Sequence, residues 1–189
     1  MIKIGILGGI GSGKTFVAKN FGYPVFNADL EVSKLYKQDK KIYRKLKKIL
    51  PKYISSFPIS KNQISKAILA NKSNLKKIVD VVHLEVKKKM NIFLKKNKNK
   101  KIVILDIPLL LENKINKKKD FLIFIESKRG EILKRLKKRT NFNYKIFKKF
   151  EEIQLPIAYK KKRSQFIIKN NFTNKSVRKN IKKILKKIV

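Results

Sequence analysis

The chain contains no cysteine, which excludes both a disulfide framework and a thiolate metal site. His83 is its single histidine, so a metal site built from several histidines is excluded as well. No apolar run approaches the ~20 residues that a membrane-spanning helix requires, and the N-terminus has no signal-peptide pattern. We therefore expect a cytoplasmic protein whose 189 residues can bury a core within one domain, and no membrane partner.

Carboxylates are also scarce, with 12 Asp and Glu against 51 Lys and Arg and a formal net charge of +39. Such a charge suggests nucleic acid, but only six of the basic residues are Arg, and Lys is spread along the whole chain. Since phosphate and base recognition favours the arginine fork, the composition fits a genome rich in A and T codons better. We expect non-specific polyanion binding at low salt, with no specific nucleic-acid partner and no protein partner.

The most informative segment is Gly8–Thr15, which matches the phosphate-binding pattern G-x-x-x-x-G-K-[ST]. An apolar run precedes it and a helical pattern follows it, which is the strand–loop–helix context that the motif requires. Glycines let the backbone N–H groups of such a loop face phosphate oxygens. Lys14 would contact the β- and γ-phosphates of a nucleotide, and the Thr15 hydroxyl would bind Mg²⁺. The expected phosphate-binding residues are Gly9, Gly11, Ser12, Gly13, Lys14, Thr15 and Phe16.

Strand-like apolar runs alternate with helical stretches, which favours a parallel sheet with right-handed crossovers. The five expected strands are Ile2–Leu7, Pro24–Phe26, Ile102–Leu105, Phe121–Glu126 and Gln165–Lys169. A terminal helix is expected at Lys179–Val189. We predict one α/β domain of three layers, α/β/α, with a five-stranded parallel sheet and a core formed by residues 1–29, 96–128 and 163–189.

More than seventy residues separate the second expected strand from the third, and helical patterns fill them. The expected helices are Leu30–Lys37, Lys41–Leu50, Lys61–Ala70 and Ser73–Lys95. In the last of these, apolar residues recur every three or four positions. We predict that residues 30–95 are a helical insertion that covers the second substrate; a purely structural cap fits the composition equally well.

A second unusual stretch, residues 129–162, has helical patterns at Gly130–Arg139 and Asn143–Tyr159. Arg135 and Arg139 are four positions apart and therefore neighbours on one helical face. We predict that this stretch is a helical lid whose arginines bind ATP phosphates on closure. A solvated basic face is the alternative.

Two carboxylates follow apolar segments, Asp29 and Asp106, and a strand would deliver each of them to the edge of the sheet where ligands bind. Asp29 could instead cap the helix expected from Leu30, and Asp106 could be satisfied by backbone groups. Glu112 could cap a helix or pair with a lysine.

Several motifs occur in an order that resembles the dephospho-CoA kinase family over essentially the whole chain. The motifs are the phosphate loop, Val25–Asp29, His83, Asp106–Glu112, Arg135 with Arg139, Gln154–Pro156 and Ile167–Asn171. The phosphate loop alone indicates only a nucleotide-binding protein. The P-L-L-x-E segment at Pro108–Glu112, the Ala-Asp at Ala28 and Asp29 and the Q-x-P at Gln154–Pro156 narrow it to this family.

The resemblance implies a P-loop kinase core that uses ATP and Mg²⁺ to phosphorylate the ribose 3′-hydroxyl of dephospho-CoA. This is the final step of coenzyme A biosynthesis. The implied catalytic residues are Lys14, Asp29 and Arg139, with Arg135 also on ATP. The implied acceptor-binding residues are Asp29, His83, Pro108 and Leu109, and the implied metal-binding residues are Thr15 and, through water, Asp106. For His83, the alternative is a histidine on a helix surface, or a partly buried one, that contacts no substrate.

Four positions depart from the family's usual pattern. They are Phe16 for a hydroxyl residue, Asn27 for the first Asp of Asp-Ala-Asp, Leu84 for the proline after the histidine, and Ser164-Gln165 for Ala-Asp. None of these departures removes a group that the chemistry requires. Because the four positions differ from the usual pattern, we nevertheless expect a slower enzyme. Two alternatives remain: a P-loop kinase acting on a nucleoside, a nucleotide or shikimate, and an ATP-regulated nucleic-acid-binding protein that only the charge suggests.

Overall fold

The computed structural model describes residues 1–138 and 142–188, which form two compact units. The first unit comprises Met1–Asn27, Asn97–Phe142 and Glu151–Val189. The second comprises Ala28–Lys96 and Asn143–Phe150. Each unit is described by itself.

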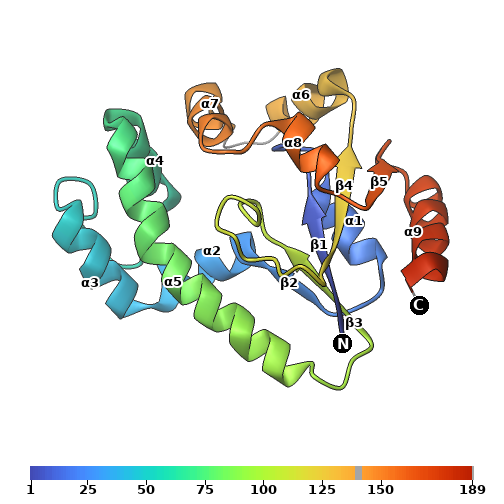
Figure 1. Cartoon of the computed structure of the whole chain (residues 1–189). Coiled ribbons are helices and arrows are strands. Elements are labelled where there is room, and N and C mark those ends of the chain that lie inside the picture. The colour runs from blue at the N-terminus through green and yellow to red at the C-terminus, as the bar shows by residue number, and fades with distance from the viewer. Residues whose placement is uncertain (139–141, 189) are drawn as a thin grey trace. The chain divides into compact units, whose positions relative to one another are not determined.

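The first unit is built on a five-stranded sheet in which all neighbouring strands are parallel (Figure 1). Its strands are β1 (Ile2–Leu7), β2 (Val25–Asn27), β3 (Ile102–Asp106), β4 (Phe121–Glu126) and β5 (Phe166–Lys169), in the order β2-β3-β1-β4-β5. The predicted β1 and β4 are confirmed at both ends, and the other three are confirmed with shifts of one residue. This order places the carboxyl end of β1, and so the phosphate loop, in the middle of the sheet.

Helices cover this sheet because its central strands are mainly apolar. All five residues of β3 are buried, as expected for a parallel strand with both faces covered. The helices of the unit are α1 (Lys14–Asn20), α6 (Arg129–Lys137), α8 (Ile157–Lys162) and α9 (Asn174–Ile188). Helices α1 and α9 pack on each other and on the sheet, where Val17, Val177 and Ile181 join the core around Ile4 and Ile104.

The second unit is helical and has its own core. Its helices are α2 (Ala28–Gln38), α3 (Lys40–Ile49), α4 (Lys61–Ala70), α5 (Lys72–Lys96) and most of α7 (Tyr144–Glu152). The predicted apolar stripe of α5 is buried at Leu75, Ile78, Val82, Val86 and Met90. Helices α2, α3 and α4 pack against α5. The capping box of Ser60 with Gln63 starts α4.

Two predictions of helices differ from the structure by more than two residues at an end. The single helix expected at Asn143–Tyr159 is wrong, because α7 ends at Glu152 and α8 starts at Ile157. Pro156 explains the break, since proline lacks an N–H donor and disfavours helical backbone in the residue before it. The terminal helix α9 begins at Asn174, five residues before the predicted start.

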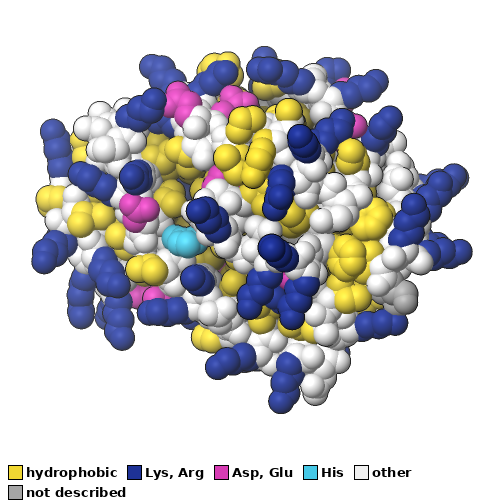
Figure 2. All heavy atoms as spheres, in the orientation of Figure 1, with side chains coloured by type: hydrophobic (Ala, Val, Ile, Leu, Met, Phe, Trp, Pro, Cys, Tyr) yellow, Lys and Arg dark blue, Asp and Glu magenta, His cyan; other side chains and the backbone are white. Residues whose placement is uncertain are grey.

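The basic side chains do not gather in one patch on the face shown in Figure 2, where Lys and Arg are spread across the surface. Within the part of the chain that the structure describes, none of the helices has the length and apolarity needed to cross a membrane.

Candidate active site

The phosphate loop lies between β1 and α1 and has the backbone that its glycines permit. Gly13 caps α1 with a φ of 87°, in the left-handed region that favours glycine. The Lys14 ammonium Nζ donates to the carbonyl oxygens of Gly8 at 3.1 Å and Gly9 at 2.8 Å. The Lys14 ammonium group therefore lies against the backbone of the loop itself, at the place where a phosphate group would be held.

Two polar residues that the sequence reasoning missed hold this loop in place. The Ser12 carbonyl oxygen accepts hydrogen bonds from Ser127 Oγ at 2.8 Å and from Asn170 Nδ2 at 2.9 Å. Asn170 is buried, and its Oδ1 accepts from the backbone N–H of Phe172 at 2.9 Å. The segments after β4 and β5 thus fix the loop through the carbonyl group of Ser12.

A second cluster lies where β2, β3 and the start of α1 meet. Thr15 Oγ1 donates to Asp106 Oδ2 at 2.6 Å, and Asn27 Nδ2 also donates to Asp106 Oδ2. Asn27 pairs with Asp106 in the register of β2 with β3, which is why the two side chains meet. Asp106 is only 3% exposed, so its carboxylate depends on these side chains for hydrogen bonds. The alternative in which backbone groups satisfy Asp106 is not what the structure has.

The residue with which β2 ends at this edge is Asn27, and Asp29 follows it by two positions, so the place of Asp29 at the ligand-binding edge stays a prediction. Strand β2 ends at Asn27, and Asp29 lies in the first turn of α2, in the second unit. Because α2 begins at Ala28, Asp29 does not cap a helix starting at Leu30. A carboxylate in a first helical turn interacts favourably with the helix dipole.

One sequence signal would have found the missed residues. Asn27, Ser127 and Asn170 each end or directly follow an apolar strand, as Asp106 does. Because the carboxyl ends of parallel strands lie at one edge, polar residues there collect around the ligand site. The rule that predicts a role for Asp106 therefore holds for amide and hydroxyl side chains as well as for carboxylates.

Of the pair of lid arginines predicted to bind ATP, the structure describes Arg135. The guanidinium of Arg135, on α6, lies 4.0 Å from the ring centroid of Phe172, a cation–π contact. Phe172 has a φ of 62°, an uncommon conformation for an aromatic residue. Arg139, and with it the predicted pairing on one helical face, lies outside the described residues. Phe16 is half-buried and packs against the core of the sheet.

The turn that follows β3 contains the remaining predicted residues of the first unit. Pro108 and Leu109 are half-buried within it. Glu112 pairs with a lysine, as one prediction had it: its Oε1 lies 2.7 Å from Lys160 Nζ and accepts from the Leu155 N–H at 2.9 Å. Lys160 Nζ also donates to Gln154 Oε1 at 3.0 Å. The P-L-L-x-E and Q-x-P segments are thus joined directly by the hydrogen bond from Leu155 to Glu112, and indirectly through the buried Lys160.

His83 lies on α5, in the second unit, and is half-buried. Its Nε2 atom is buried and has no hydrogen-bond partner within residues 1–138 and 142–188. A neighbouring position, Leu84, is exposed. The histidine is therefore placed within its own unit, and its relation to an acceptor stays a prediction.

The electrostatics of the first unit suit a polyanionic ligand with a divalent cation. A hydroxyl and a carboxylate oxygen, at Thr15 and Asp106, are ligands that Mg²⁺ prefers, and Mg²⁺ commonly uses few protein groups beside phosphates and water. Among the described residues, no cluster of three His, Cys, Asp or Glu could hold a metal ion. In other parts of the chain, burial raises the pKa of Tyr36, and the hydrogen bond from Lys161 lowers the pKa of Glu126.

Comparison with known proteins gives consistent matches over the whole chain. A family model described as dephospho-CoA kinase matches residues 2–176. The dephospho-CoA kinase of Wolbachia sp. subsp. Brugia malayi (strain TRS) is 36% identical over 187 residues, which covers 96% of this chain and 95% of that protein.

Solved structures match in the same way. The crystal structure of TT1252 from Thermus thermophilus has a TM-score of 0.79 at 25% identity, covering 100% of this chain and 98% of that one. The dephospho-CoA kinase from Campylobacter jejuni has a TM-score of 0.60 at 21% identity, covering 98% and 96%. The latter likeness supports the three-layer fold alone.

Proposed function

We propose that the phosphate loop and the Thr15–Asp106 pair carry out the transfer of phosphate from ATP to dephospho-CoA. The chain belongs to the dephospho-CoA kinase family, and this transfer is the last step of coenzyme A synthesis. The observation that carries the proposal is the 2.6 Å hydrogen bond from Thr15 to Asp106, directly after a complete phosphate loop. The phosphate goes to the ribose 3′-hydroxyl, giving coenzyme A and ADP.

The donor side uses the loop as an electrostatic cradle, because phosphoryl transfer needs positioning and charge neutralisation more than covalent chemistry. Backbone N–H groups from Gly9 to Thr15 hold the phosphates. Lys14 exchanges its carbonyl partners for β- and γ-phosphate oxygens. Arg135 and Arg139 neutralise further charge as residues 129–162 close as a lid.

On the metal side, Thr15 would hold Mg²⁺ through its hydroxyl, and Asp106 would hold it through water. A Mg²⁺ ion bound there supplies positive charge to the oxygens that gain negative charge in the transition state. Asn27 holds the Asp106 carboxylate by its amide hydrogen bond, so the carboxylate keeps its orientation toward Thr15.

The acceptor side uses Asp29, which orients the 3′-hydroxyl and accepts its proton. The support is chemical: Asp29 is a carboxylate two residues after Asn27, and the Ala-Asp motif of the family falls on Ala28 and Asp29. His83, on α5, and Pro108 with Leu109, in the turn after β3, bind other parts of dephospho-CoA. We place the reaction in the cytoplasm, with a small molecule as the only partner.

The test is an ATP-consumption assay with a panel of acceptors: dephospho-CoA, a nucleoside, a nucleotide and shikimate. We expect turnover with dephospho-CoA and a 3′-phosphorylated product by mass spectrometry. Turnover with another acceptor, and none with dephospho-CoA, would contradict the proposal. ATP turnover that depends on added nucleic acid would favour the nucleic-acid alternative instead.

A further inference from the structure

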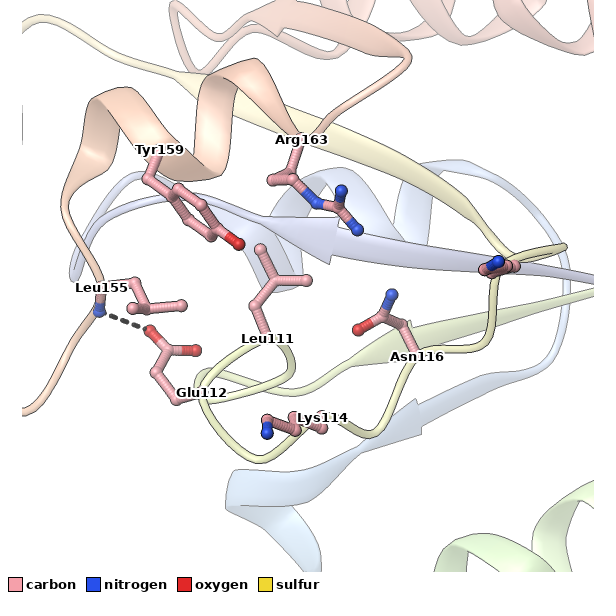
Figure 3. Close-up of a pocket in the computed structure, with 8 residues that line it drawn as sticks. Leu111, Glu112, Lys114, Asn116, Leu155, Tyr159 and Arg163 are labelled. Carbon is pink, nitrogen blue, oxygen red and sulfur yellow. Dashed lines mark hydrogen bonds between the residues drawn. The ribbon is translucent and has the colours of Figure 1, made fainter.

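We propose that a pocket formed by the turn after β3 and by helix α8 binds the pantetheine phosphate arm of dephospho-CoA. The inference rests on the proposed function and adds a subsite to it. The pocket has a volume of about 420 Å³, within the range of small-molecule sites, and is lined by Leu111, Glu112, Lys114, Asn116, Lys118, Leu155, Tyr159 and Arg163 (Figure 3). All of these residues belong to the first unit.

The pocket holds a buried acceptor whose hydrogen bonding is incomplete. The side chain of Glu112 is 10% exposed, and its Oε1 is used by Lys160 and by the Leu155 N–H. Its Oε2 is also buried but has no hydrogen-bond partner in the part of the chain that the structure describes. Figure 3 shows Glu112 among the lining residues, with only one carboxylate oxygen on the bond to Leu155. A buried carboxylate oxygen without a donor is unfavourable, so a small rotation of the Glu112 side chain toward a ligand N–H or O–H at this wall would gain a strong hydrogen bond.

The rim of the pocket is positively charged. Lys114, Lys118 and Arg163 line it, while its one carboxylate, Glu112, already pairs with Lys160. Lys114 adopts a φ of 49° within a turn closed by the hydrogen bond from its own N–H to the Leu111 carbonyl at 3.0 Å. The turn thus fixes the backbone of one of these cations. An anionic group on the ligand would be attracted by all three charges.

The middle of the pocket is mixed in character. Leu111 and Leu155 supply apolar surface, while the Asn116 amide and the Tyr159 hydroxyl supply groups that both donate and accept hydrogen bonds. A ligand that fits all of these features is a flexible chain with an anionic end, an apolar branch, and several hydroxyl and amide donors.

The pantetheine phosphate arm has this combination. It carries phosphate at one end, a dimethyl branch, a hydroxyl and two amide N–H groups along its length. The start of α8 also lies beside the phosphate loop. Ile157, between the lining residues Leu155 and Tyr159, has its Cδ1 3.6 Å from the position that a Cβ would take at Gly9. An acceptor held near the loop can therefore place its arm along α8.

The first experiment uses 4′-phosphopantetheine, which is the arm without the adenosine. We expect it to inhibit the ATP-dependent phosphorylation of dephospho-CoA competitively with dephospho-CoA and not competitively with ATP. Pantetheine without the phosphate should inhibit more weakly, since it lacks the group that the three cations bind. Competition with ATP, or equal inhibition by inorganic phosphate, would overturn the assignment.

The second experiment compares variants of the lining. Arg163→Met should raise both the inhibition constant of 4′-phosphopantetheine and the KM for dephospho-CoA about tenfold, as expected for one lost charge-assisted hydrogen bond. The KM for ATP should stay unchanged. Arg178→Met, on α9 and outside the pocket, removes the same charge and should leave both constants unchanged. If Arg163→Met and Arg178→Met behave alike, the pocket does not bind the arm.

The contribution of Glu112 is tested with the double variant Glu112→Leu with Lys160→Met, which removes the buried pair together and avoids leaving one charge unpaired. It should also weaken 4′-phosphopantetheine binding, with near-native folding by circular dichroism. The two failures are distinguishable. If the unmodified protein does not phosphorylate dephospho-CoA, the proposed function fails. If it does, and the pocket variants keep their KM, only the subsite fails.

Discussion

Thr15 Oγ1 and Asp106 Oδ2 lie 2.6 Å apart, although 91 positions separate the two residues in the chain. The hydrogen bond links the first residue after the loop lysine to the last residue of β3. Because β1 and β3 are neighbours in the sheet, the loop that leaves one strand meets the end of the other. Through this hydrogen bond the carboxylate of Asp106 lies next to the phosphate-binding loop.

The pair predicts a matched set of variants at the metal site. Thr15→Val and Asp106→Asn should each raise the Mg²⁺ concentration needed for half-maximal turnover, by about 10- to 100-fold. Thr15→Ser keeps the hydroxyl and should resemble the parent. The measurement is a Mg²⁺ titration of initial rate. An unchanged Mg²⁺ requirement in Asp106→Asn would show that its carboxylate does not serve the metal.

Asn27 predicts an effect on metal binding that does not depend on turnover. Asn27→Asp would place a second carboxylate beside Asp106, where like charges repel each other and attract a divalent cation. Without Mg²⁺ we expect a lower Tm than that of the parent. On adding Mg²⁺ we expect a larger rise in Tm, because a ligand that binds the folded state more tightly stabilises it more. The measurement is thermal unfolding with and without Mg²⁺. An equal rise in both proteins would argue against a metal at this cluster.

Asp29 predicts a loss of turnover without a loss of folding. Asp29→Asn should lower kcat at least about 100-fold, as expected for removing a group that accepts a proton, and should leave the KM for ATP unchanged. Glu31→Gln is the control, because Glu31 also lies in the first turn of α2 and pairs with Lys34. Steady-state kinetics of both variants decide the matter. If Asp29→Asn keeps the parent kcat, Asp29 does not act on the acceptor hydroxyl.

The buried pair of Glu112 with Lys160 predicts strong non-additivity in stability. Lys160→Met or Glu112→Leu alone should lower the free energy of unfolding by about 3–5 kcal/mol, because each leaves one buried charge without its partner. The double variant should lie near the parent. Lys161→Met is the control, since its pair with Glu126 is exposed and worth under about 1 kcal/mol. Urea unfolding followed by circular dichroism measures all four, and equal losses in Lys160→Met and Lys161→Met would contradict the prediction.

Two glycines with similar backbone predict different outcomes for the same substitution. Gly13 and Gly22 have φ values of 87° and 74°, so alanine at either is strained by about 1 kcal/mol. At Gly22 nothing lies within 4 Å of the added Cβ, whereas at Gly13 it would clash with Asn170 Nδ2 and lie 2.8 Å from Phe172 Cε1. Gly13→Ala should therefore displace the residues that hold the phosphate loop and abolish measurable ATP binding. Gly22→Ala should lose a few degrees of Tm and keep ATP binding, which calorimetric titration with ATP checks; similar ATP affinities in the two variants would contradict this account.

Local patterns in the sequence were sufficient where one short segment carries the whole signal. The phosphate loop, the apolar strands β1 and β4 and the stripe of α5 each depend on spacing within a few residues, and the structure has them as predicted. The prediction of α7 and α8 as one helix is wrong, because Pro156 interrupts a segment in which the spacing of apolar residues alone indicates one helix. The physical rule for proline was available in the sequence and would have divided the segment correctly.

The amino-acid sequence by itself determined the family, the donor loop and the alternation of strands and helices, because these follow from residue types at fixed local spacing. Tertiary structure decided which side chains meet across long separations. The strand order brought Asn27 to Asp106, and it brought Asn170 to Ser12 across 158 positions. It also joined Glu112 to Lys160, burying one of the few carboxylates of a chain whose net charge is +39. Such contacts depend on sheet register and on the path of the turn after β3, which local spacing does not encode.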